Sequence, residues 1–340
     1  MRSFASDNNS GVHPLVFKAI EGANIDHAVG YGDDEWTEAA TAKIKETFGD
    51  VADPYFVFNG TGANSVALQS VTRPFNSIIC AASAHIYVDE CGAPQRMSGC
   101  SVTAIPTSNG KLSVELIKPH LKHFGECHHS QPGVVYISQT TELGTVYTIE
   151  EIEAIANLVH AHGMYLHMDG ARLANAAAFL GCSLRATSVD AGVDILSFGG
   201  TKNGMMMGES VISFREEISK NLKFYRKQSA QLASKMRYLS AQFIPYLEGD
   251  LWLKNANAAN FAATKLHEAL KKYASVEFTQ KVETNQLFLK MPKEAADKLL
   301  EEYFFYVWNE DTNEVRFVTS WDTSDKDIAD LIASFEKVLK

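Results

Sequence analysis

Short apolar runs alternate with longer helical patterns over the first two thirds of the chain. Short apolar runs bounded by turn residues are typical of buried strands, and apolar residues at every third or fourth position are typical of amphipathic helices. This alternation predicts a mostly parallel α/β sheet. The predicted strands span residues 55–58, 77–81, 102–105, 133–138, 165–169 and 195–198, and the predicted helices span 14–23, 38–48, 66–71, 114–121 and 149–162.

The last third of the chain has a different pattern. The stretch 216–247 has a basic, helical pattern. The residues after it mix helical and strand patterns, which predicts a smaller α+β domain with a helix over 256–273, strands over 286–290, 303–308 and 314–319, and a helix over 325–339. A chain of 340 residues exceeds the size at which one core usually stops growing. We therefore expect an N-terminal arm and large domain over 1–247, and a small C-terminal domain over 248–340.

Polar residues and glycines follow directly on several predicted strands. Ligands bind to open α/β sheets beyond the carboxyl ends of the strands, and parallel strands end at one edge. We therefore expect a set of residues to converge there: Gly60, Thr61, His85, Asp169, Arg172 and Lys202.

Lys202 lies in a glycine-rich turn, after the apolar run 195–198 and before three methionines. These neighbours predict that its side chain points into a cleft, where desolvation lowers the pKa of an amine. A neutral lysine amine can form a Schiff base with a carbonyl compound such as pyridoxal phosphate. The alternative is a solvated lysine in a flexible loop.

Three further features allow two interpretations each. Asp169 either caps the following helix or keeps a pyridine nitrogen protonated, and Arg172 is either solvated or clamps a carboxylate. His85 is either an ordinary loop histidine or a ring stacked on a flat cofactor.

The glycine-rich turn 59–64 joins a strand to a helix without a Walker pattern, so it favours a phosphate monoester over a nucleotide.

Composition excludes several classes of protein. A net charge of -10 argues against nucleic-acid binding, and no apolar run reaches the length of a membrane span. The five cysteines have no paired spacing, which favours a reducing, cytoplasmic environment. Histidines 128, 129, 160, 162 and 167 make no metal-ligand set with these cysteines, so we expect no metal. The sequence contains no G-x-S-x-G elbow, which argues against a serine hydrolase.

The motifs together carry a family resemblance that spans nearly the whole chain in the right order. The chain resembles the low-specificity L-threonine aldolases, within the aromatic amino acid β-eliminating lyase superfamily of fold-type I pyridoxal phosphate enzymes. The matching segments are Ser-Asp at 6–7, Asn-Gly-Thr at 59–61, Ala-His-Ile-Tyr at 84–87, Leu-His-Met-Asp-Gly-Ala-Arg at 166–172, Ser-Phe-Gly-Gly-Thr-Lys at 197–202 and Val-Arg-Phe-Val-Thr at 315–319.

The resemblance implies a role for each matching residue. Lys202 would be the Schiff-base lysine, Asp169 the partner of the pyridine nitrogen, and His85 the ring stacked on the cofactor. Gly60 and Thr61 would hold the phosphate. The substrate carboxylate would be gripped by Ser6, Arg172 and Arg316, with Arg172 also beside the cofactor, and His128 would lie near the substrate hydroxyl as a second candidate base.

The resemblance also implies an activity and an assembly. We expect an aldolase that cleaves L-threonine and L-allo-threonine to glycine and an aldehyde, in a homodimer or homotetramer with shared active sites. The chain departs from the family pattern at two places, Gln139–Glu142 and Asn203. These departures put in doubt which substrate side chains the site selects. The alternatives are a β-eliminating lyase or phenylserine-type aldolase with an aromatic pocket, and a cofactor-free binding protein. Candidate residues for that pocket are Tyr31, Trp36 and Tyr87, and those for cross-subunit contacts are Tyr31, Arg226 and Lys227.

Overall fold

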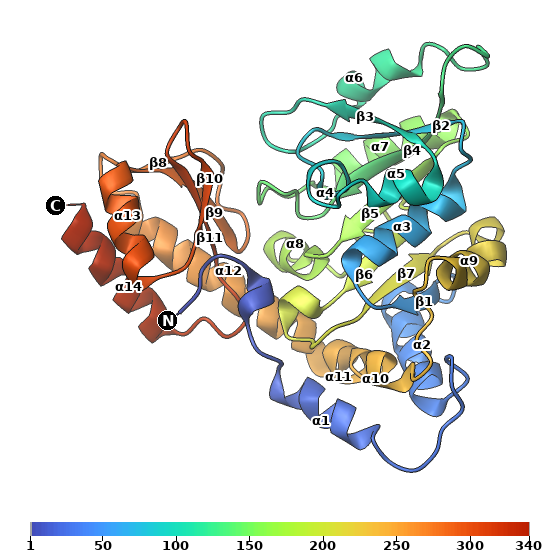
Figure 1. Cartoon of the computed structure of the whole chain (residues 1–340), viewed down its shortest axis with the longest axis horizontal. Coiled ribbons are helices and arrows are strands. Elements are labelled where there is room, and N and C mark those ends of the chain that lie inside the picture. Colours follow the sequence, from blue (N-terminus) through green and yellow to red (C-terminus); the bar gives the residue numbers. More distant parts are fainter. Residues whose placement is uncertain (1, 340) are drawn as a thin grey trace.

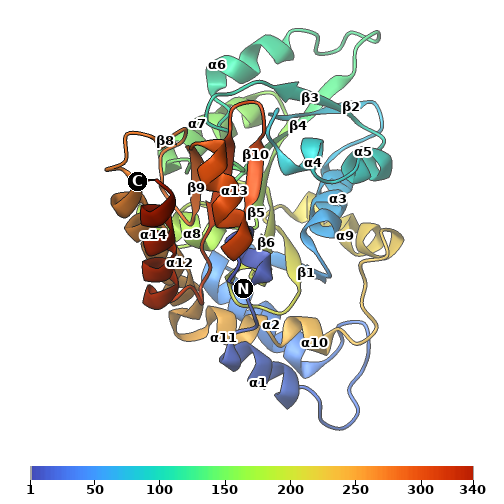
Figure 2. The ribbon, with the colours of Figure 1, turned by 60° about the vertical axis from the view of Figure 1, so that its left-hand side comes forward.

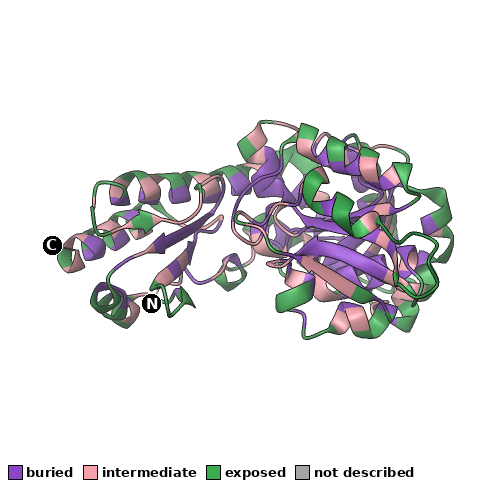
Figure 3. Ribbon diagram, turned by 90° about the horizontal axis from the view of Figure 1, so that it is seen from above, coloured by how far each residue is buried: buried purple, intermediate pink, exposed green. Residues whose placement is uncertain are grey.

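The computed structural model describes residues 2–339 and places them in two lobes (Figure 1). A seven-stranded sheet forms the centre of the larger lobe, and a four-stranded sheet forms the centre of the smaller one. Seen from above, buried residues concentrate in the strands and on the inner sides of the helices (Figure 3). No helix within the described range is both long and apolar enough to cross a bilayer.

The large sheet has the strand order β1-β7-β6-β5-β4-β2-β3. Neighbouring strands from β3 to β6 are parallel, whereas β7 runs antiparallel to both β6 and β1. The predicted mostly parallel sheet is therefore confirmed, with β7 as the strand that the pattern did not predict. The strands are β1 (Asp53–Val57), β2 (Asn76–Ala81), β3 (Ser101–Ile105), β4 (Gln131–Ser138), β5 (Tyr165–Gly170), β6 (Ile195–Gly199) and β7 (Glu209–Ser213).

Helices cover both faces of this sheet (Figure 1). Most predicted helices are present, but the long pattern over 216–247 is broken into three. The helices are α1 (Pro14–Gly22), α2 (Glu35–Phe48), α3 (Gly60–Val71), α4 (His85–Val88), α5 (Ala93–Ser98), α6 (Val114–Ile117), α7 (Ile149–Ala161), α8 (Leu173–Leu180), α9 (Glu216–Gln228), α10 (Arg237–Ser240) and α11 (Phe243–Leu247), with 3₁₀ turns η1 (Asp7–Asn9), η2 (Lys118–Leu121), η3 (Thr201–Asn203) and η4 (Glu248–Asp250).

Two segments expected to be loops are helical. The glycine-rich turn after β1 is the first turn of α3, because Asn59 Oδ1 accepts a hydrogen bond from the backbone N–H of Gly62 at 2.8 Å and caps the helix. His85 begins the short helix α4. Both helices therefore start at the sheet edge where the ligand was expected.

The smaller lobe is an antiparallel sheet in the order β10-β11-β9-β8, covered by helices. The N-terminal arm joins it: Ser3 pairs with Phe304, and Phe4 is fully buried in the core of this lobe. The arm thus runs between the two lobes (Figure 1), and in Figure 2 the smaller lobe is seen in front of the larger one. The elements are α12 (Leu251–Leu270), β8 (Glu277–Phe278), β9 (Gln286–Lys290), α13 (Lys293–Glu302), β10 (Tyr306–Asn309), β11 (Glu314–Val318) and α14 (Asp325–Val338).

Candidate active site

Most of the residues singled out from the sequence line two adjoining cavities at the carboxyl ends of the parallel strands. The inner cavity is lined by Gly60 and Asp169, and the outer cavity by Ser6 and Arg316. Thr61 follows Gly60 in the first turn of α3. The outer cavity has a volume of about 380 Å³, which suits a small molecule. Both cavities share His85, Glu142, Arg172 and Lys202.

Lys202 enters the pocket from η3, directly after β6. Desolvation and the positive charge of Arg172 lower the pKa of its amine, although Asp7, Asp169 and Glu209 oppose the change. This direction agrees with the prediction for a lysine in a cleft. A β-carbon at Gly199 would overlap the carboxylate of the buried Glu209, so a larger residue there would displace that side chain.

The carboxylate of Asp169 is held from three sides. Asn64 Nδ2 and Tyr136 Oη donate to its Oδ2 at 2.9 and 2.7 Å, and the Ala171 N–H donates to its Oδ1 at 2.9 Å. Desolvation raises the pKa of Asp169, but the bond from Asn64 and the charge of Lys202 outweigh it and lower the pKa overall. Asp169 therefore stays ionised in the pocket. The alternative of a helix cap is wrong, because the N-cap residue of α8 is Arg172.

His85 belongs to the same network. Its Nδ1 lies 2.8 Å from Oε1 of the buried Glu90, which also accepts a hydrogen bond from Asn64 Nδ2 at 2.8 Å. The bond to Glu90 raises the pKa of His85. Asn64 thus connects the histidine and aspartate sites through one amide. Glu90 and Tyr136 were not predicted from the sequence, and Asn64 was predicted only as the last residue of the glycine-rich turn.

Arg172 is paired with the N-terminal arm. Its Nε and Nη2 donate to the two carboxylate oxygens of Asp7 at 2.7 and 2.9 Å, and Asn285 donates to the same carboxylate at 3.0 Å. Asp7 is fully buried; desolvation raises its pKa, but the charges of Arg172 and Lys202 outweigh this and lower it. The arm therefore fixes the orientation of an arginine at the pocket wall.

Arg316 reaches the pocket from β11 of the smaller lobe. Its guanidinium lies 5.3 Å from the ring centre of Tyr306 and 4.8 Å from that of Trp308, and its Nη2 donates to the Ala5 carbonyl at 3.1 Å. Its Nε is buried without a partner. Arg316 does not lie on a strand edge, since β11 lies between β10 and β9, and the nearby Glu314 accepts a hydrogen bond from Thr279.

Some predicted residues do not reach this pocket. His128 lies on an exposed loop before β4, whereas the pocket residue Ser138 lies at the other end of that strand, roughly 23 Å beyond Gln131. The structure therefore does not bring His128 to the pocket of its own chain. The three aromatic candidates from the large domain do not line the pocket either, and its aromatic wall is instead Tyr306 and Trp308.

The sheet order, with a lysine after β6 and an ionised aspartate on β5, defines a fold-type I enzyme. Known structures agree: an alanine–glyoxylate aminotransferase from Nostoc sp. shares the fold with a TM-score of 0.70 at 15% identity, covering 100% of this chain and 95% of that one. More specifically, the chain belongs to the beta-eliminating lyase family, whose family model matches residues 3–294.

Individual relatives are similar over almost the full length of the chain. A low specificity L-threonine aldolase of Pseudomonas sp. (strain NCIMB 10558) is 39% identical over 99% of this chain and 98% of that protein. The structure of Leishmania major threonine aldolase is 29% identical, with a TM-score of 0.95 and complete coverage of both chains. The family predicted from the motifs is thereby confirmed.

Proposed function

We propose that this chain is a pyridoxal phosphate-dependent aldolase that cleaves L-threonine, L-allo-threonine and related β-hydroxy-α-amino acids to glycine and an aldehyde. The observation that carries the proposal is the meeting of Lys202, Asp169 and His85 with two arginines around one pocket. The names of the relatives with 39% identity, and that of the Leishmania major structure, support the same reaction.

The residues present fit the proposed cofactor. Asp169 offers an ionised carboxylate to a protonated ring nitrogen, and the lowered pKa of Lys202 favours the neutral amine that would hold the cofactor. Gly60 and Thr61 begin the twelve-residue helix α3, whose N-terminal N–H groups suit a phosphate. When bound, pyridoxal phosphate supplies an electron sink for the Cα–Cβ bond that breaks.

We assign the substrate carboxylate to Ser6, Arg172 and Arg316. The unpaired Nε of Arg316 is a buried donor beside the pocket, and a carboxylate is the acceptor that a guanidinium binds best. Asp7 already occupies two nitrogens of Arg172, so Arg172 contributes its charge and its fixed position to the carboxylate site. Arg316 is therefore the main contact in this assignment.

We assign the removal of the β-hydroxyl proton to His85. Its Nδ1 faces Glu90, which leaves Nε2 as the nitrogen that receives the proton. Glu90 raises the pKa of the ring and so stabilises the protonated form. His128 would act here only if it came from a second chain, because it lies away from its own pocket.

The test is a product assay on the purified enzyme supplied with cofactor. Threonine, allo-threonine and phenylserine are each incubated with it, and glycine, aldehyde, ammonia and keto acid are measured. Equal amounts of glycine and aldehyde from threonine or allo-threonine support the proposal. Ammonia with a keto acid would instead establish a β-eliminating lyase, and cleavage of phenylserine alone would establish a phenylserine aldolase.

Assembly and location are part of the proposal. We propose a homodimer or homotetramer in which neighbouring subunits share active sites. Tyr31 and Lys227 are suited to such a contact, because the Lys227 amine lies 5.4 Å from the centre of the exposed Tyr31 ring, whereas Arg226 is largely packed against Tyr55. The five cysteines are free thiols, which supports a cytoplasmic location.

A further inference from the structure

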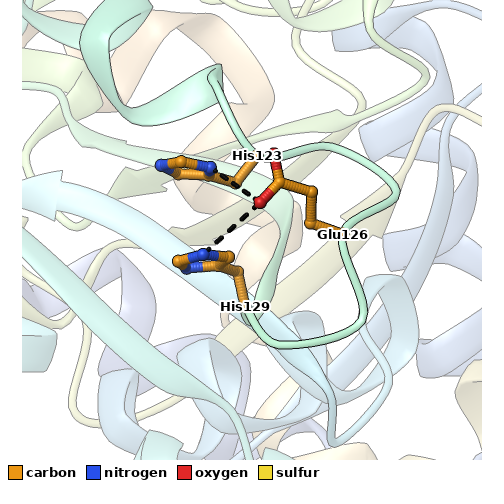
Figure 4. Close-up of side chains that lie close together, drawn as sticks. All are labelled: His123, Glu126 and His129. Atoms are coloured by element: carbon orange, nitrogen blue, oxygen red, sulfur yellow. Dashed lines mark ion pairs between the residues drawn. The ribbon is translucent and has the colours of Figure 1, made fainter.

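A loop on the large lobe, between η2 and β4, carries two histidines and a glutamate that face one another. His123, Glu126 and His129 follow each other at intervals of three residues, and all three are exposed. Figure 4 shows both rings directed at the same carboxylate oxygen. The histidine spacing in the sequence predicted no metal site, and His123 and Glu126 were not among the residues singled out. This cluster lies at the opposite end of β4 from the catalytic pocket.

Two of the three distances between the donor atoms are close to those of a tetrahedral metal site. Glu126 Oε2 lies 3.1 Å from His123 Nδ1 and 3.5 Å from His129 Nε2, and the three atoms all lie within 4.8 Å of one another. Zinc binds nitrogen and oxygen at roughly 2.0 to 2.2 Å, so neighbouring ligands of a tetrahedral zinc ion are about 3.3 to 3.6 Å apart. The two distances to Glu126 are therefore close to the required spacing. The rings of His123 and His129 are stacked, with centroids 4.1 Å apart and planes 12° from parallel, so these exposed rings have to tilt for both nitrogens to face one ion.

The side chain of Gln131 holds the loop in this shape. Its Oε1 accepts a hydrogen bond from the Gly125 N–H at 2.7 Å. Its Nε2 lies 3.2, 3.1 and 2.9 Å from the carbonyl oxygens of His123, Glu126 and His129, the three residues that carry the donor atoms. Gln131 is itself fixed to the sheet, because its backbone N–H donates to Phe75. One amide thus positions the backbone of every proposed ligand.

We propose that His123, Glu126 and His129 bind a divalent transition metal such as Zn²⁺, with a fourth position left for water. Two imidazoles and one carboxylate are a donor set that favours zinc, copper or nickel over magnesium or calcium, which prefer oxygen ligands. This site is separate from the catalytic pocket and does not depend on the proposed aldolase activity. Metal binding competes with protons, because each imidazole has to be neutral to act as a ligand.

Isothermal titration of the untagged holoenzyme with Zn²⁺ tests the site, after unbound cofactor has been dialysed away. At about pH 7.5 we expect one Zn²⁺ per chain. His123→Ala, Glu126→Gln and His129→Ala should each weaken binding at least tenfold. Gln131→Ala should weaken it about tenfold, the lower end of the effect of a supporting group.

The control is His120→Ala, which removes an exposed histidine close by in η2 and should leave zinc affinity unchanged. A second measurement guards against variants that fold poorly: Zn²⁺ should raise the Tm of wild type but not that of Glu126→Gln. Glu126→Gln keeps the size of the side chain and loses its charge. The proposal is overturned if wild type binds no zinc, or if binding survives Glu126→Gln and His129→Ala and is instead removed by Cys127→Ser.

Discussion

Replacing Arg316 by alanine tests the assignment of the substrate carboxylate. The buried Nε of this arginine has no partner and lies beside the pocket, so a substrate carboxylate would complete its hydrogen bonding. A charge-assisted bond of this kind contributes about 1.5 to 3 kcal/mol, which corresponds to roughly 10- to 150-fold in kcat/KM. We expect Arg316→Ala to lose that much catalytic efficiency for threonine. Arg316→Lys keeps the charge but not the planar fork, so its loss should be smaller.

The same change also removes packing, which has to be measured separately. The contacts of the guanidinium with Tyr306 and Trp308 are each worth about 0.5 to 2 kcal/mol. A matched control is Arg237→Ala, because Arg237 likewise lies against two rings, of Trp36 and Tyr238, and donates to a backbone carbonyl outside the pocket. Arg237→Ala should lower stability without a comparable loss of kcat/KM.

The assay measures glycine formation against threonine concentration, together with the visible absorption of the bound cofactor. Arg316→Ala should keep the cofactor absorption, because the proposed carboxylate contact is made only by the substrate. If Arg316→Ala cleaves threonine as efficiently as wild type, Arg316 does not bind the carboxylate. A loss of the same size in Arg237→Ala would mean that the effect reflects packing.

Two further predictions concern side chains that hold the catalytic groups in place. Arg172→Ala leaves the buried carboxylate of Asp7 without its ion-pair partner and should lower the free energy of unfolding by about 3 to 5 kcal/mol. Asp7→Ala should restore part of this loss in the double variant. Denaturant unfolding measures both, and a double variant no more stable than Arg172→Ala would refute the reasoning. If neutral His85 is the base, activity falls as the pH drops through its pKa, and because Glu90 raises that pKa, Glu90→Gln should move the fall to lower pH. An acid limb of kcat/KM that stays in place would contradict the role of Glu90.

The sequence predicted the main sheet and the edge at which the site lies, because both follow from local patterns. Buried strands read as short apolar runs, and a polar residue directly after such a run lies at the sheet edge whatever the rest of the fold does. Asp169 and Lys202 were found in this way. Strand β7 was missed because only two of its five residues, Val211 and Ile212, are apolar, so it makes no apolar run of strand length. Its burial depends on pairing with β6 on one side and, on the other, with β1 from a distant part of the chain.

The supporting groups of the site could not be predicted in the same way. Asn64 faces the pocket only because the capped helix α3 starts at Gly60, and Glu90 reaches His85 through a turn of irregular structure. Asp7 meets Arg172 across 165 residues of sequence, a contact that exists only once the arm lies between the lobes. Such pairs depend on tertiary structure and leave no periodic signal. The expected position of His128 came from the resemblance alone, and a motif does not tell which end of a strand it lies at.

The most direct test of the account is the link between the cofactor and one lysine. Wild type, Lys202→Ala and the surface control Lys254→Ala are supplied with pyridoxal phosphate, reduced with borohydride and digested, and the peptides are mapped by mass spectrometry. The account predicts that the reduced cofactor is attached at Lys202 in wild type and in Lys254→Ala, and at no lysine in Lys202→Ala. A wild type that takes up no cofactor, or one labelled at another lysine, would contradict it.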